Sequence, residues 1–592
     1  MKPLLQRLTP ALAMGGVLLA GLVLTWWTVR RSDSEMRADL LGQAQLVAQS
    51  LDVECLQTFT GTSADLQRPE YQRVKGELVL TREAIPRCRG IRLMGGASGA
   101  AGDALQAGRP ETAVLYLMDV GTGSEAGPGD LCAKASPRLR GAFDGAGAFV
   151  EGPFHDERGP WISGMVPILS SQSKTAFAVL GMDIDARDWN QRLVWAGLPP
   201  ALLTLALVGM MGFGKAWLVR RGSRPAVSRM GHLEATLVCA VGLLLTLFAT
   251  WMLRQREERG RELAFGQLAG SRTAEIAAAL QVIDRSELAT LASFYQHSEN
   301  ITRSEFQSFT GHLAKNPNVQ VWEWVPAVSE AQRARFTEDA RAAGLKDFEI
   351  WQKDGQGRRV PASGREVYYP VLQATPGTGN EPALGYDLGS DPLRRAALEA
   401  AAHSGLVTGS DPLTLVQETG NEKALLIFQP VFANEVEGHT LRGFVLAALR
   451  CGALLENAST DDSVLLSFSL LHPGSAAEWL ATIRRGARDP SSRLCAARPV
   501  MAFGKTFVVT AKAGPEFLAL HPASAWLTAL FGLLLSAAAA SLVSVLHRRR
   551  EKLEQLVMER SSEFQERSAD LKAITDSALD AIVMMDAQGH IS

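Results

Sequence analysis

The sequence lacks most of the features that mark common enzymes and metalloproteins. Only 6 of its 592 residues are cysteine, with no Cys-x-x-Cys or paired His/Cys spacing, so neither a disulfide scaffold nor a zinc site is expected. No Walker loop, glycine-rich nucleotide loop or recognisable Ser/His/Asp set is present. The sequence therefore predicts no catalytic residue, no metal ligand and no cofactor.

A basic excess is also missing. The net charge of −2 leaves no domain-wide surplus of Lys and Arg to displace phosphate counterions, so no nucleic-acid partner is expected. An oxidising compartment would allow disulfides between Cys451 and Cys495 and between Cys88 and Cys132. The alternative is that these cysteines are small, unpaired hydrophobic residues.

Long apolar runs are the most prominent feature that is present. A helix needs about 20 apolar residues to cross a bilayer, and four runs approach that length. They cover residues 11–29, 196–219, 235–253 and 523–546, and tryptophans stand near their ends, as in membrane–water interfaces. The first run has no small-x-small cleavage site, so it is interpreted as an uncleaved anchor. The sequence thus predicts four transmembrane helices in contact with membrane lipid.

The basic residues indicate the orientation of these helices. Arginines concentrate in the short segment 220–234, and basic residues begin the segment 547–572 directly after the last run. The positive-inside rule makes both segments cytoplasmic, together with the N-terminus at 1–10. Residues 30–195 and 254–522 then lie outside. We expect a multi-pass protein of the cell inner membrane whose two large outer segments lie in the periplasm.

Both outer segments have the pattern of mixed α and β structure. In 30–195, short apolar runs bordered by turn residues predict strands of a small antiparallel sheet. In 254–522, a charged stalk leads into a helix whose apolar residues recur at three- and four-residue steps. These residues are Ile276, Leu280, Ile283, Leu291 and Phe294. The predicted fold class is a multi-domain membrane protein: α-helical transmembrane spans, two α+β (PAS-like) extracytoplasmic domains and a cytoplasmic helical linker.

An ordered set of short motifs follows that helix. They read WVPAV, YYPV, GYDLGS, HSG, SDPL and FQPVF, from Trp324 to Phe432. Together they resemble the CHASE domain, the extracytoplasmic sensor of plant cytokinin receptors and many bacterial receptors, over roughly residues 290–450. The resemblance implies a small-molecule ligand, an aspartate that reaches it at Asp387 and a backbone contact at Gly409. A glycine stands there instead of a bulky apolar residue, which argues against a cytokinin-like purine.

The same resemblance suggests an aromatic lining for the pocket. Its candidates are Tyr386, Phe428, Tyr369 and Trp324. The alternative is that these four rings are ordinary core residues, and that Asp387 or Ser390 caps the helix that begins at Pro392. In 30–195, the stretches GPWISGMVPI and AVLGMDI resemble a Cache-like sensor. That likeness implies Trp161, Tyr116 and Asp183 as pocket residues, with core packing and strand capping as the alternative.

The C-terminal part is typical of a signalling linker. Residues 547–572 carry apolar residues in a rough heptad, interrupted by Arg560 and Arg567, which predicts a short coiled coil and a homodimer. The alternative is a single solvated linker helix. Residues 573–592 resemble the opening of an incomplete PAS domain. We therefore expect the sensory region of a sensor histidine kinase. The alternatives are a diguanylate cyclase or phosphodiesterase receptor, and a transporter-associated membrane protein. Enzyme activity stays undecided, because no catalytic domain is present in this stretch.

Overall fold

The computed structural model describes most of the chain, which divides into two compact units. The described residues are 2–579 except 86, 97–112, 122–124, 134, 157–158, 171–174, 222–231, 299–300, 416–421, 434–439, 460, 484–493 and 523. The first unit, here called the helical unit, comprises Met1–Arg31, Leu193–Arg259 and Ala523–Ser592. The second, called the sensor unit, comprises Ser32–Arg192 and Gly260–Pro522.

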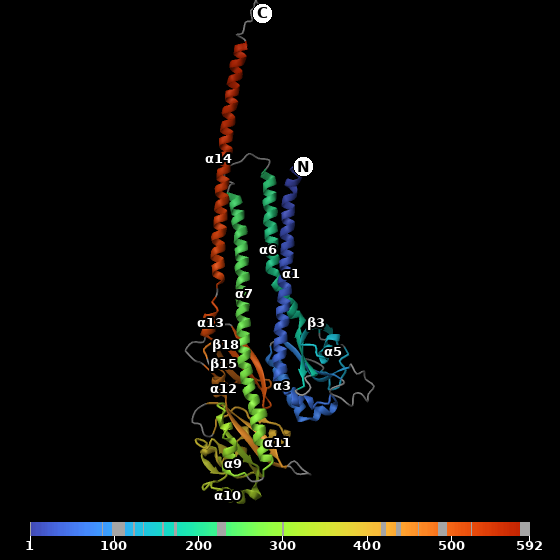
Figure 1. The fold of residues 1–592 in the computed structure, drawn as a ribbon, viewed down its shortest axis with the longest axis vertical. Helices are drawn as coiled ribbons and strands as arrows, with labels where there is room; N and C mark the ends of the chain where they lie inside the picture. Colours follow the sequence, from blue (N-terminus) through green and yellow to red (C-terminus); the bar gives the residue numbers. More distant parts are fainter. Residues whose placement is uncertain are drawn as a thin grey trace, which may run out of the picture. The chain divides into compact units, whose positions relative to one another are not determined.

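Four long helices contain the four apolar runs (Figure 1). They are α1 (Lys2–Ser50), α6 (Ala186–Arg221), α7 (His232–Gln281) and α14 (Ala525–Leu579). Each contains a segment whose mean hydropathy, between 1.8 and 2.2, and length suffice to cross a membrane. Because these segments expose leucine and other apolar side chains all around the helix, a lipid environment accounts for them better than water does. The prediction of helices suited to span a membrane is confirmed.

The first outer segment contains one antiparallel sheet with the strand order β2-β1-β5-β4-β3. Its strands are β1 (Cys88–Gly96), β2 (Val114–Gly121), β3 (Phe149–Asp156), β4 (Gly159–Leu169) and β5 (Ala176–Asp185). Helix α5 (Pro137–Phe143) covers one face of it, where Leu139 and Ala142 join a core cluster with Met94 and Met165. The predicted antiparallel sheet is therefore present.

A second sheet follows the long helix of the second outer segment. Its order is β11-β6-β14-β13-β12. The strands are β6 (Val319–Pro326), β11 (Gln373–Thr375), β12 (Thr408–Gly409), β13 (Ala424–Phe432) and β14 (Leu441–Arg450). Helix α11 (Pro392–Ser404) packs on one face, and its Ala397 and Leu398 are buried beside Leu426 and Leu446. Of the ordered motifs, WVPAV begins in β6 and FQPVF ends β13, while the other four lie in the segments that connect the strands of this sheet.

A third sheet was not expected from the sequence. It has the order β16-β15-β18-β17 and comprises β15 (Val464–Leu470), β16 (Glu478–Thr482), β17 (Cys495–Ala502) and β18 (Lys505–Ala513). Both sheets share one core with the long helix, which continues from α7 through the π-helical stretch η3 (Val282–Leu288) into α8 (Ala289–Gln296). Figure 1 shows β15 and β18 beside α7. The helix therefore serves as a common backing for two sheets.

The predicted apolar stripe of that helix lies in this shared core. Ile276, Leu280, Ile283 and Leu291 are fully buried, and Phe294 packs against the same cluster. The stripe of the long helix therefore packs on the domain itself.

Shorter elements complete the fold. The helices are α2 (Val53–Gln57), η1 (Ser63–Gln67), α3 (Pro69–Ala84), α9 (Arg303–Thr310), η4 (Leu313–Lys315), η5 (Glu330–Gln332), α10 (Arg333–Ala342), η6 (Glu381–Ala383), η7 (Leu388–Ser390), α12 (Cys451–Ala458) and α13 (Pro515–Leu520). The strands are β7 (Val328–Ser329), β8 (Trp351–Lys353), β9 (Arg359–Pro361) and β10 (Val367–Tyr368).

The six cysteines are free, so neither of the two conceivable disulfides forms. Of the expected PAS opening, residues 580–592 lie outside the described residues.

Candidate functional site

The two faces of strand β6 pack against different neighbours. One face lies against the long helix, and the other lies against the cluster beneath α11. Side chains of a strand alternate between faces, so Trp322 and Trp324 pack in the shared core while Val321 and Val325 join the opposite cluster beneath α11. Glu323 lies between the two tryptophans and therefore shares the face of Val321 and Val325. We call this side of the second sheet the α11 face.

Three of the predicted aromatic residues lie together on the α11 face. Phe428 is fully buried, and Phe444 contacts it with ring centroids 6.1 Å apart. Tyr369 meets the same Phe444 at 5.6 Å, and Tyr386 lies 4.9 Å from the ring of Trp351. The sequence thus selected a set of rings that the fold brings into one cluster.

Asp387 adjoins this cluster and is held by three protein donors. Its Oδ1 accepts hydrogen bonds from the backbone N–H groups of Tyr369 (2.9 Å) and Gly389 (3.1 Å), and its Oδ2 accepts one from Arg365 (2.8 Å). Burial raises the pKa of this fully buried carboxyl, whereas the Tyr369 N–H and the Arg365 guanidinium oppose the shift. Asp387 therefore fixes the loop that carries Tyr386 and caps the short helix η7.

The capping role expected for the Pro392 helix belongs to another residue. The side chain of Asp391 accepts hydrogen bonds from the backbone N–H groups of Leu393 and Arg394, at 3.0 and 3.1 Å. Asp387 and Ser390 are therefore not the N-cap of α11. The sequence offered three polar residues within five positions, and only the chain path shows which of them stands directly before the first helical turn.

The two remaining predicted residues lie away from this cluster. Trp324 stacks on Tyr295 of the long helix, with centroids 3.8 Å apart, on the face opposite to α11. Gly409 lies on the edge strand β12, where its N–H donates to the carbonyl of Phe503 at 2.8 Å. A Cβ added to Gly409 would lie 3.3 Å from Phe503, so glycine permits this close approach.

Two charged residues of the α11 face were not among the site residues predicted from the sequence. Glu323 is 4% exposed, and in the sheet register it stands between Leu446 of β14 and Ala374 of β11. Arg394 in the first turn of α11 is 5% exposed. The sequence signal for Glu323 is its position between two tryptophans on a central strand. Side chains alternate along a strand, so the glutamate must lie on the face opposite to the tryptophans, and that face is buried as well.

Arg394 is anchored by groups around it. It donates to the Tyr386 hydroxyl and the Thr414 carbonyl, both at 3.2 Å, and pairs with Asp391 at 3.3 Å. Its guanidinium also lies 5.3 Å from the ring centre of Tyr386. The fold thus presents one oriented cation to the α11 face.

The electrostatics of Glu323 are unusual. Burial raises the pKa of its carboxyl to about 8, and Arg394 partly opposes that shift. A buried ionised carboxylate is costly without hydrogen bonds, so the protonated form is favoured at neutral pH. Strongly shifted acids are more frequent at functional sites than elsewhere, which draws attention to this residue.

The first sheet also has a polar face. Arg92 pairs with Asp183 at 3.0 Å and with Asp119 at 3.5 Å, and the hydroxyl of Ser163 donates to Asp183. The guanidinium of Arg92 also lies 5.6 Å from the ring centre of Trp161. Two of the residues suggested by the Cache likeness, Asp183 and Trp161, thus meet at Arg92. The third, Tyr116, packs beside the neighbouring apolar cluster.

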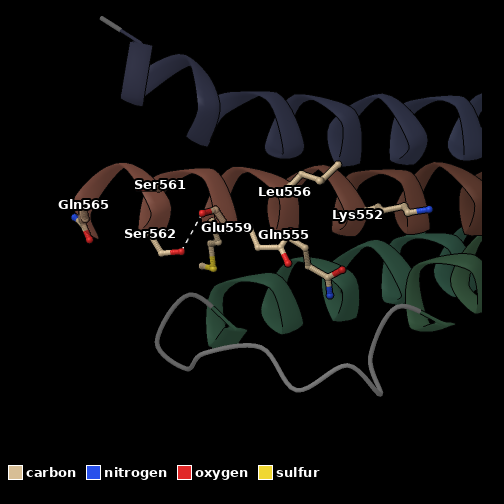
Figure 2. A pocket seen from close by; sticks show the side chains of 8 residues that line it. Lys552, Gln555, Leu556, Glu559, Ser561, Ser562 and Gln565 are labelled. Atoms are coloured by element: carbon tan, nitrogen blue, oxygen red, sulfur yellow. Dashed lines mark hydrogen bonds between the residues drawn. The ribbon is translucent and has the colours of Figure 1, made fainter. Parts of the chain in front are cut away.

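A hollow on α14 does not form a site of this kind. Figure 2 shows its lining, which comes entirely from that helix. The residues are Lys552, Gln555, Leu556, Met558, Glu559, Ser561, Ser562 and Gln565. All of them are exposed, so none offers the desolvated polar group that a selective small-molecule site needs.

Residues 299–479 match the family model of the CHASE domain. The chain carries a CHASE domain. The match includes the whole second sheet and reaches the third, so the predicted resemblance over 290–450 is confirmed and extended. Among curated proteins, none matches the chain.

Several solved sensor structures are similar to parts of the chain. An extracellular ligand-binding receptor from Desulfohalobium retbaense matches with a TM-score of 0.28 and 11% identity, over 42% of this chain and 40% of its own. The ligand-binding domain of a Pseudomonas aeruginosa amino-acid chemoreceptor in complex with GABA matches with a TM-score of 0.24 and 17% identity, over 42% and 97%. A Campylobacter jejuni chemoreceptor sensory domain with isoleucine bound matches at 0.19 and 8%, over 45% and 97%. The chain thus spans two fifths of the Desulfohalobium receptor, and the assignment of a sensory domain rests on the CHASE match.

Proposed function

We propose that the chain is the sensory region of a transmembrane signal-transduction receptor. Its CHASE domain binds a small extracytoplasmic ligand, and the membrane helices pass the signal to a cytoplasmic PAS and output module of a sensor histidine kinase. One observation carries the proposal: the CHASE domain is joined to α7 and α14, and each of these helices contains an apolar segment long enough to cross a membrane. A ligand biases such a receptor by its difference in affinity for two arrangements of these helices.

Within this proposal the ligand binds at the α11 face. Tyr386, Tyr369 and Phe428 provide an apolar wall, which most small-molecule sites need, and Asp387 holds the loop that positions two of these rings. Gly409 and Trp324 contribute from outside the cluster, by allowing the approach of Phe503 and by anchoring the sheet to the long helix.

Ligand binding is tested on the full chain in lipid nanodiscs. A metabolite library is screened for compounds that raise the midpoint of thermal unfolding, because a ligand that binds only the folded state stabilises it. We expect one chemical class to raise the midpoint in the wild type and to lose that effect in Tyr369→Leu. The matched control Phe336→Leu, which changes a ring in a separate cluster, should keep the effect. If no compound of a broad library shifts the midpoint, the receptor proposal fails.

The membrane orientation has its own test. Reporter enzymes that are active on only one side of the membrane are fused after residue 400 and after residue 560. We expect the first to report the outside and the second the cytoplasm, as the positive-inside rule requires. A cytoplasmic signal at residue 400 contradicts an extracytoplasmic sensor.

A homodimer is part of the proposal, and α14 is its proposed contact. Leu553, Val557 and Phe564 are 63%, 66% and 77% exposed and follow one another at steps of four and seven residues. Such a stripe is stabilised by a second copy in a parallel coiled coil, and Arg560 and Arg567 occupy the same seam. Replacing both arginines with leucine should therefore tighten self-association, measured by analytical ultracentrifugation in detergent, by about tenfold or more.

A further inference from the structure

The α11 face holds a buried carboxylic acid, Glu323, and a buried arginine, Arg394, and the hydrogen bonding of the arginine is incomplete. Burial and the charge of Arg394 are what shift the pKa of Glu323, and no hydrogen bond from the described residues contributes to that shift. In the same part of the structure, the Nε atom of Arg394 is buried and has no hydrogen-bond partner. Buried polar groups are nearly always satisfied, so an unpartnered arginine nitrogen on the same face as a buried carboxyl indicates a partner that the chain does not supply.

Rigid elements hold both groups in place. Glu323 lies on the central strand β6 and is flanked by paired strands on both sides. The backbone N–H of Arg394 is tied to the Asp391 cap, and its guanidinium to Tyr386 and Thr414. Neither group has to be ordered when a ligand arrives, so the conformational cost of binding is small.

We propose that the ligand of the CHASE domain is a small amino carboxylate, whose ammonium group pairs with Glu323 and whose carboxylate pairs with Arg394. This inference rests on the function proposed above and narrows it to a chemical class. A simple amine would meet the positive charge of Arg394, and a simple carboxylate would meet Glu323 whenever that residue ionises. A molecule with both charges satisfies both groups and adds no net charge to a buried site.

The inference has a proton-linked consequence. With its pKa raised to about 8, the Glu323 carboxyl is mostly protonated at pH 7 before the ligand binds. The ammonium group favours the ionised carboxylate, so the carboxyl O–H bond breaks and its proton passes to the buffer. The ligand keeps its own protons, and the charge balance is complete. Binding should therefore release most of one proton per ligand.

The experiment uses isothermal titration calorimetry of the full chain in nanodiscs at pH 7. The probes are the proteinogenic L-amino acids, β-alanine and 5-aminopentanoate, with propylamine and propionate as references that carry one charge. Titrations in phosphate and in Tris, whose ionisation heats differ, give the number of protons released. We expect at least one amino carboxylate to bind about tenfold or more tightly than both references and to release most of a proton.

Matched variants isolate the two charges. Glu323→Gln should abolish proton release and weaken binding by about tenfold or more, whereas Glu338→Gln, at an exposed position of α10, should change neither. Arg394→Met should remove the preference for the amino carboxylate over propylamine, and Arg394→Lys should restore part of it. Circular dichroism and thermal unfolding establish that each variant is folded.

The outcomes separate this inference from the general function. If a compound from the broad metabolite library binds the wild type and Glu323→Gln equally, the amino-carboxylate inference is wrong and the receptor proposal stands. If an amino carboxylate binds without proton release, the pairing with Glu323 is wrong. If no compound binds or stabilises the wild type, both proposals fail.

Discussion

The polar faces of the first and second sheets differ in how they neutralise buried charge. In the first sheet, Arg92 stands between Asp119 and Asp183, so each carboxylate has a nearby cation. In the second, Asp387 is satisfied by three donors, while burial raises the pKa of Glu323 and the charge of Arg394 opposes this shift only in part. The comparison suggests that the first network stabilises its own sheet, whereas the second retains binding capacity for a molecule outside the chain.

The strongest test of that contrast removes the cation of the first sheet. Arg92→Met removes the cation that pairs with the buried carboxylates of Asp119 and Asp183, which should cost about 3–5 kcal/mol of stability. The measurement is denaturant unfolding of the full chain, followed by tryptophan fluorescence. Arg335→Met is the control, because that arginine is 88% exposed. A loss no greater than the control's would show that the network is not structural.

Asp387→Ala tests the satisfied carboxylate of the second sheet. The change removes the acceptor of three hydrogen bonds and leaves Arg365 and two backbone N–H groups without it, at a cost of about 2–4 kcal/mol. The same unfolding measurement applies, with Asp347→Ala at an exposed position as the control. If stability is unchanged while ligand stabilisation disappears, Asp387 acts mainly on the ligand.

The pH dependence of stability tests Glu323. Its folded-state pKa of about 8 exceeds the ordinary value of 4.5, so between these values the folded protein holds a proton that the unfolded chain has lost. Its contribution to stability is therefore complete at low pH and disappears as the pH rises through 8, by up to about 1.4 kcal/mol per pH unit. Glu323→Gln should flatten the curve from pH 5.5 to 8.

The quantity that reports on Glu323 is the difference in stability between wild type and Glu323→Gln at each pH, because other carboxyls also titrate in this range. Burial raises the pKa of Glu77 to about 7, for example. That contribution is common to both proteins and cancels in the difference. Parallel curves for wild type and Glu323→Gln would mean that Glu323 does not titrate in this window.

The smallest expected effect concerns the anchoring of Arg394. Tyr386→Phe removes the hydroxyl that accepts its hydrogen bond and keeps the ring, so we expect a loss of about 1 kcal/mol. Tyr369→Phe is the matched comparison on the same face. A much larger loss would indicate that Tyr386 supports the whole network rather than one guanidinium bond.

Local features of the fold followed from the sequence. Thr302 and Glu305 have the spacing that predicts a capping box, and the box forms, with the backbone N–H of Glu305 3.3 Å from the Thr302 hydroxyl oxygen. Helix α11 begins at Pro392 and ends before Gly405, whose φ of 72° suits glycine. These signals could be read directly because each depends on residues a few positions apart.

Features that depend on the pairing of strands distant in the chain did not follow from the sequence. The division of the described strands of 254–522 into two larger sheets and two two-stranded ones depends on which strands meet, and short apolar runs do not specify their partners. Trp324 was a candidate for the pocket lining together with Tyr386 and Phe428, and the strand places it on the face opposite to theirs, because one step along a strand reverses the direction of the side chain.

The sequence by itself determined the apolar helices, the buried stripe of the long helix and the presence of a CHASE domain, because hydrophobic periodicity and local motifs act over short stretches of chain. Only the tertiary structure decided which charges meet. Glu323 on β6 and Arg394 on α11 lie far apart in the sequence. They share one buried face because of the sheet register and the position of α11. Desolvation then gives these ordinary residues their unusual chemistry.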